Sequence, residues 1–91
     1  MTEHWCMTYS GRVQGVGFRV RTRRIAIAHC VSGTVRNCND GTVELVVEGE
    51  EAAISRFLGA VSLELGRYIR DVSTHREPAS DTPLIGFTVL A

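Results

Sequence analysis

Glycines and arginines gather in one short stretch of the chain, residues 10–19, which reads Ser-Gly-Arg-Val-Gln-Gly-Val-Gly-Phe-Arg. An alternating apolar run precedes this stretch and a helical pattern follows it, which predicts a turn between a strand and a helix. The first N–H groups of a helix lack partners and lie at the positive end of its dipole, so they favour an anion such as phosphate. Gly15 and Gly17 permit positive φ and leave room for the anion. Arg19 adds a planar cation that can hold two phosphate oxygens.

These residues admit other interpretations when each is taken alone. The turn is not a nucleotide-binding P-loop, because no Gly-Lys-Ser or Gly-Lys-Thr follows the glycines. On spacing alone, Arg19 is equally well explained as a solvated arginine at the start of a helix. Asn37 ends the next predicted strand, and its turn propensity alone favours a role in starting the hairpin that follows.

The stretch from Gly11 to Arg19 resembles the signature of the acylphosphatase family. A second match follows at Gly33–Asn37, with Asp40–Glu44 behind it. The interval between the arginine and the asparagine that end the two matches is also the family's spacing, and the resemblance covers about residues 9–89. It implies hydrolysis of acyl phosphates to a carboxylate and inorganic phosphate by an enzyme that needs no metal or cofactor.

The resemblance also implies roles for individual residues. The turn at residues 13–19 would hold the phosphoryl group of a small acyl phosphate, or a phosphate or sulfate anion, and Asn37 would orient the attacking water. A phosphate oxygen of the substrate would take the proton of that water. The residues expected to bind phosphate are Gln14, Gly15, Val16, Gly17, Phe18 and Arg19. The residues expected to be catalytic are Arg19 and Asn37.

A non-catalytic module that binds phosphate or carbamoyl phosphate is the second interpretation. Domains that resemble acylphosphatases also form the N-terminal part of hydrogenase-maturation carbamoyltransferases, where the string usually continues Gly-Phe-Arg-Pro-Phe. Val20 follows Arg19 in this chain, which favours the free-standing enzyme. A third interpretation, a ferredoxin-like module that binds RNA or another protein, lacks both a basic balance and the aromatic sheet motif of RNA-recognition domains.

Three positions depart from the family pattern. Thr34 stands where family members often have an aromatic residue. His29 and Cys30 stand where Leu-Gly commonly ends the first helix. Cysteine adopts positive φ less readily than glycine, so we expect a strained or differently shaped helix end at Cys30.

Hydrophobic periodicity predicts the elements that must position these residues. Strands are expected at 5–9, 31–37, 42–48, 68–77 and 85–90, and helices at 18–29 and 50–65. Two helices on one face of an antiparallel sheet form a ferredoxin-like α+β sandwich, here one domain over residues 1–91. The predicted core stripe of the first helix consists of Phe18, Thr22, Ile25, Ala26 and His29. Val20 and Ile27 fall on its opposite side, as a small exposed apolar spot or a contact surface.

Composition narrows the classes of partner. Ten basic and ten acidic residues cancel, so no overall field favours nucleic acid or an anionic membrane. The arginines at 21, 23 and 24 are therefore expected to be solvated or to draw an anionic substrate towards the turn. Three widely spaced cysteines fit neither a zinc site nor a disulfide framework, and free thiols in the cytoplasm are expected. We expect no apolar stretch long enough to span a membrane. We also expect the protein to be a monomer.

Overall fold

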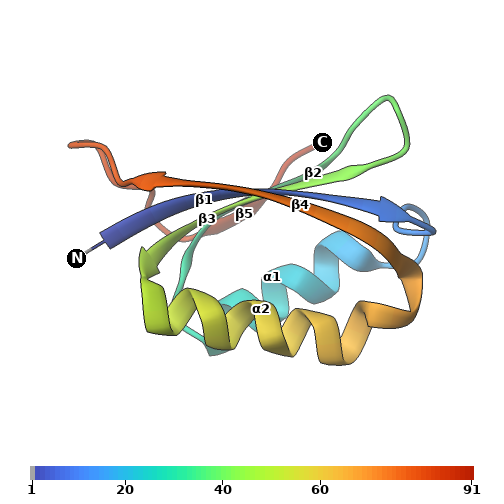
Figure 1. The fold of residues 1–91 in the computed structure, drawn as a ribbon, viewed down its shortest axis with the longest axis horizontal. Coiled ribbons are helices and arrows are strands. Elements are labelled where there is room, and N and C mark those ends of the chain that lie inside the picture. Colours follow the sequence, from blue (N-terminus) through green and yellow to red (C-terminus); the bar gives the residue numbers. More distant parts are fainter. Residues whose placement is uncertain (1) are drawn as a thin grey trace.

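Two helices pack on one face of a five-stranded sheet in the computed structural model, which describes residues 2–91 (Figure 1). The elements are β1 (Thr2–Gly11), α1 (Phe18–Ala28), β2 (Ser32–Asn37), β3 (Val43–Glu50), α2 (Glu51–Leu65), the 3-10 turn η1 (Gly66–Tyr68), β4 (Ile69–Pro78) and β5 (Phe87–Val89). The strand order is β4-β1-β3-β2-β5. The ferredoxin-like α+β class is confirmed. The sheet is mixed, however, and not antiparallel throughout, because β5 pairs with β2 in parallel.

The first strand runs beyond the predicted residues 5–9 at both ends. Its apolar side chains, Trp5, Met7 and Tyr9, are buried on the face that carries the helices, as their alternation predicted. Residues 2–4 pair with residues 48–50 of β3, and residues 10 and 11 pair with β4. These strand ends are polar, so a hydrophobic pattern could not reveal them.

The helices bury the stripes that their periodicity predicted. The buried residues of α1 are Phe18, Thr22, Ile25 and Ala26, and those of α2 are Ile54, Phe57, Val61 and Leu65. His29, the fifth member of the predicted stripe of α1, is half-buried and follows the helix, which ends at Ala28. The rings of Tyr9 and Phe18 lie 5.3 Å apart between centroids. This contact fixes the N-terminus of α1 above β1. Within residues 2–91, neither helix is long and apolar enough to cross a membrane.

Cys30, which follows the C-terminus of α1, has a backbone conformation that glycine adopts more easily. Its φ is 56°, which lies in the left-handed region. The N–H of Cys30 donates to the carbonyl of Ile27, and the N–H of Val31 donates to the carbonyl of Ala26. These two bonds form a Schellman motif, in which a glycine usually stands at the position of Cys30. The expected strain at this helix end is therefore present as a positive φ on a residue with a Cβ.

The substitution Cys30→Gly is expected to raise the free energy of unfolding by about 1 kcal/mol, because it removes the left-handed penalty of a residue with a Cβ. Chemical denaturation of both proteins in reducing buffer measures the difference. Cys30→Ala is the matched control, since it removes the thiol and keeps the Cβ, and it is expected to give no such gain. An equal gain in both variants would show that the thiol, and not the backbone, is unfavourable here.

Glu48 connects β3 to the loop before β5 on the face of the sheet away from the helices. Its side chain is 4% exposed. One carboxylate oxygen lies 2.6 Å from His4 Nδ1, and the other accepts the backbone N–H of Leu84 at 2.8 Å. Burial acts to raise the pKa of Glu48, but the hydrogen bonds from His4 and Leu84 outweigh it, and the pKa lies below its usual value. The folded state thus favours the carboxylate.

The fold is therefore expected to lose the contribution of Glu48 in acid. A lowered pKa stabilises the native state above the unfolded-state pKa of about 4.3, and this stabilisation disappears as the pH falls through the native value. Glu48→Gln is expected to lower the free energy of unfolding by roughly 2 kcal/mol at pH 7, with a gap from wild type that closes as the pH falls below about 5. Urea denaturation across this range measures the gap. A gap that stays constant with pH would contradict the assignment.

Candidate functional site

The turn between β1 and α1 exposes a row of backbone N–H groups. Gly15 and Gly17 have φ of 77° and 76°, in the left-handed region that glycine adopts without a steric penalty. Within residues 2–91, no hydrogen bond is donated by the backbone N–H groups of residues 15–20, and the first such bond of the helix runs from Arg21 to the carbonyl of Gly17. The unpaired donors lie at the positive end of the dipole of α1. A turn between a strand and a helix is thus present where the sequence predicted it, and its free donors are of the kind that favours an anion.

Buried side chains and hydrogen bonds hold this turn in place. Val13 is 0% exposed and packs into the core, as does Phe18 at the other end of the turn. The backbone N–H of Arg12 donates to the carbonyl of Tyr68 at 2.8 Å. The side-chain amide of Gln14 donates to the carbonyls of Cys38 and Thr42, both at 2.9 Å. The turn is thereby connected to η1 and to the β2–β3 hairpin.

Arg19 is half-buried and is held by the end of the chain. Its Nη1 donates to the carbonyl of Leu90 at 2.8 Å. Within residues 2–91 this is the one hydrogen bond that its guanidinium makes, and four of its five N–H donors stay free. A cation restrained in this way can hold an anion with little further loss of side-chain entropy.

Asn37 lies at the end of β2, where the alternation of that strand turns its side chain to the same face as the buried Val35. It is half-buried, and its side chain makes no hydrogen bond within residues 2–91. A small cavity of about 120 Å³ joins it to the turn. The lining residues are Val13, Gly15, Gly17, Phe18, Arg19, Val20 and Asn37. No carboxylate is among them, so no charge in the lining opposes an anion.

The cavity brings together most of the residues that the sequence singled out. Gly15, Gly17, Phe18, Arg19 and Asn37 all line it. Gln14 and Val16 do not. The side chain of Gln14 is engaged with the hairpin, and Val16 packs partly against the core.

Two features of the site were not predicted. Val20 lines the cavity, although its signal in the sequence was no more than an exposed apolar position on α1. The hydrogen bond from Arg19 to the carbonyl of Leu90 could not be predicted from the sequence, because every residue has a backbone carbonyl.

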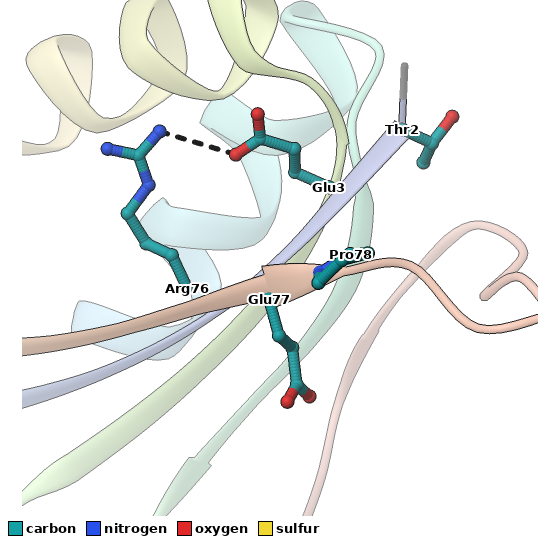
Figure 2. A pocket seen from close by; sticks show the side chains of 5 residues that line it. All are labelled: Thr2, Glu3, Arg76, Glu77 and Pro78. Carbon is teal, nitrogen blue, oxygen red and sulfur yellow. Dashed lines mark hydrogen bonds and ion pairs between the residues drawn. The ribbon is translucent and has the colours of Figure 1, made fainter.

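A larger hollow, about 250 Å³, lies at the opposite end of β1 and is lined by Thr2, Glu3, Arg76, Glu77 and Pro78. Figure 2 shows Arg76 and Glu3 pointing towards one another, with Glu77 on the other side of the strand. Arg76 pairs with Glu3 at 3.3 Å and with Glu51 at 2.5 Å, and its guanidinium lies 3.9 Å from the ring centroid of Trp5. Two carboxylates therefore already neutralise the one cation in this hollow. It is a poor site for an anion.

A chain of polar side chains on the face away from the helices is equally unsuited to catalysis. Cys6 Sγ lies 3.9 Å from His4 Nε2, and His4 contacts Glu48 through its other nitrogen. This order resembles a nucleophile, a base and an orienting carboxylate. Burial, with the charges of Glu44 and Glu77, raises the pKa of the Cys6 thiol, so the reactive thiolate is disfavoured. Within residues 2–91, no three His, Cys, Asp or Glu side chains gather closely enough to hold a metal ion.

Comparison with known sequences gives one consistent family. The family model described as Acylphosphatase matches residues 5–89. An acylphosphatase of Clostridium acetobutylicum is 35% identical over 83 residues, which cover 89% of this chain and 90% of that protein. An acylphosphatase of Geobacillus kaustophilus is 44% identical over 69 residues, which cover 75% of this chain and 71% of that protein.

Comparison with solved structures agrees. The crystal structure of acylphosphatase from Bacillus subtilis superposes with a TM-score of 0.85 at 29% identity, and each chain is covered in full. The structure of T. kodakarensis HypF matches with a TM-score of 0.79 at 28% identity, and the match covers this whole chain but 12% of that protein. The same fold thus occurs both as a chain of this size and as a small part of a larger protein.

The contacts of Gln14 predict a stability effect. Gln14→Ala removes two neutral hydrogen bonds and is expected to lower the free energy of unfolding by about 1 kcal/mol. Gln14→Glu is the sharper variant, because a carboxylate cannot donate to either carbonyl of the hairpin and is expected to destabilise more than alanine. Urea denaturation at pH 7 compares the three proteins. Wild-type stability in Gln14→Glu would contradict the tether.

Proposed function

The chain belongs to the acylphosphatase family of acyl phosphate hydrolases, and we propose that its reaction takes place in the cavity between the turn at residues 15–20 and Asn37. The observation that carries this proposal is the content of that cavity. Unpaired backbone donors, the guanidinium of Arg19 and a free side-chain amide meet there, with no opposing carboxylate. Each of these groups suits one part of a phosphoryl transfer to water.

In the proposed complex, the N–H groups of residues 15–20 and the free donors of Arg19 bind the phosphoryl oxygens. Phosphoryl transfer depends on positioning and on stabilisation of charge, and these donors are fixed before the substrate arrives. The hydrogen bond from Arg19 to the carbonyl of Leu90 keeps one edge of the guanidinium in place while the other edge faces the anion. Arg19 would thus both bind the substrate and stabilise the transition state.

Asn37 would hold the attacking water. An amide both accepts and donates hydrogen bonds, so its oxygen can accept a hydrogen bond from the water while its nitrogen donates one to the phosphoryl group. Asparagine is not a base at neutral pH, so the proton needs another acceptor. A phosphoryl oxygen of the substrate is at hand, as the family resemblance implies.

The proposed step balances with these groups alone. The water oxygen forms a bond to phosphorus, the bond between phosphorus and the acyl oxygen breaks, and its electron pair leaves with the carboxylate. The proton of the water passes to a phosphoryl oxygen, which gives inorganic phosphate. A carboxylate is stable at neutral pH because carboxylic acids have a pKa of about 4, so the leaving group needs no acid.

Substitution of the two residues is expected to separate their roles. Asn37→Ala should lower kcat by about a hundredfold to a thousandfold and leave inhibition by phosphate nearly unchanged, as when one preorganised polar group is lost. Arg19→Ala should lower kcat and also weaken phosphate inhibition. Hydrolysis of benzoyl phosphate in EDTA, with inorganic phosphate as a competitive inhibitor, measures both quantities.

Two exposed positions supply matched controls. Asn39→Ala removes an amide from the β2–β3 turn, and Arg56→Ala removes a cation from α2. Both are expected to retain wild-type rates. A wild-type protein that is folded and binds phosphate but does not turn over would overturn the enzyme proposal in favour of an accessory anion-binding module. Full activity in Asn37→Ala would overturn the role of that residue alone.

A further inference from the structure

The volume of the cavity limits what it can enclose. Its 120 Å³ is about four times the ~30 Å³ that one water occupies in the liquid, whereas pockets that enclose whole organic ligands measure about 300–1,000 Å³. A phosphoryl group, with one phosphorus and its oxygens, fits this space. The acyl part of the substrate must therefore lie outside, against the rim.

One side chain of the lining offers an apolar surface at this rim. Val13 and Phe18 are buried in the core, and the two lining glycines have no side chain. Arg19 and Asn37 are polar. Val20 is 69% exposed, and in a helix the Cα–Cβ bond leans towards the N-terminus, which is where the cavity lies. An acyl group that leaves the cavity can meet apolar surface at this position.

Accepting the proposed function, we infer that Val20 is a specificity-determining contact for the acyl group and that the enzyme favours acyl phosphates with an apolar or aromatic acyl part. The contact removes apolar surface of both partners from water, which strengthens binding in proportion to the area covered. A small acyl group such as acetyl covers little of Val20. A benzoyl group covers more.

Ile27 provides a matched control on the same helix. Seven residues separate it from Val20, so both side chains lie on one exposed face of α1, and Ile27 is 53% exposed. Ile27 does not line the cavity. A change to serine at either position removes a similar exposed apolar side chain, but Val20→Ser alone removes one that borders the site.

The test is the ratio of kcat/KM for benzoyl phosphate to kcat/KM for acetyl phosphate. Val20→Ser is expected to lower this ratio by about threefold to tenfold, because an open rim buries less apolar surface of the acyl group than a closed pocket does. Val20→Leu is expected to raise the ratio. Ile27→Ser is expected to leave it unchanged. An unchanged ratio in both Val20 variants, or an equal fall in Ile27→Ser, would overturn the inference.

A binding measurement separates this inference from the proposed function. If the wild-type protein hydrolyses neither substrate, the proposed function fails. The dissociation constants of benzoylphosphonate and acetylphosphonate then test whether Val20 contacts the acyl group. Neither phosphonate can be cleaved as an acyl phosphate is. Selective weakening of benzoylphosphonate in Val20→Ser supports the contact at the rim. Equal constants for the variant and the wild type overturn it.

Discussion

The unpaired N–H groups at the start of α1 are the constraint on which the rest of the structure depends. Buried backbone donors without partners are costly, so such groups must stay open to water or to an anion. The first turn of α1 meets this condition because the chain enters it through two glycines with positive φ, which keep side chains away from the donors. The helix behind this turn can then bury its core stripe and still present a charged end to the surface.

Positioning of this end depends on segments far apart in the sequence. Gln14 reaches the β2–β3 hairpin, the backbone of Arg12 reaches η1, and Arg19 reaches Leu90 at the end of the chain. Each of these hydrogen bonds is modest alone, at about 1 kcal/mol. Together with the buried side chains of Val13 and Phe18, they hold a turn that has no regular structure of its own.

The parts of the fold that a hydrophobic period specifies could be read from the sequence. The stripes of α1 and α2 and the buried face of β1 follow from periods of 3.6 and 2. The parallel pairing of β5 with β2 and the bond from Arg19 to Leu90 could not, because backbone groups of one segment make them with another and leave no trace in residue types. Gly15 and Gly17 could be singled out from their place between a predicted strand and a predicted helix, whereas Arg19 and Asn37 were assigned roles because the stretches that contain them resemble the acylphosphatase signature. Val20 could be singled out only as part of an exposed apolar spot or a contact surface, because an exposed valine has many explanations.

The two ends of α1 differ in what they contribute, because one end affects stability and the other lies at the proposed site. The C-terminal end satisfies its carbonyls with a Schellman motif, and the strain there comes from Cys30, a residue that glycine could replace without touching the site. The N-terminal end leaves its donors open, and any group on this chain that satisfied them would occupy the place of the substrate in the proposed complex. Strain at Cys30 is therefore incidental to the proposed reaction, whereas that reaction requires the open donors at residues 15–20. Since the net charge of the chain is zero, attraction for the anionic substrate must come from this local arrangement and not from the protein as a whole.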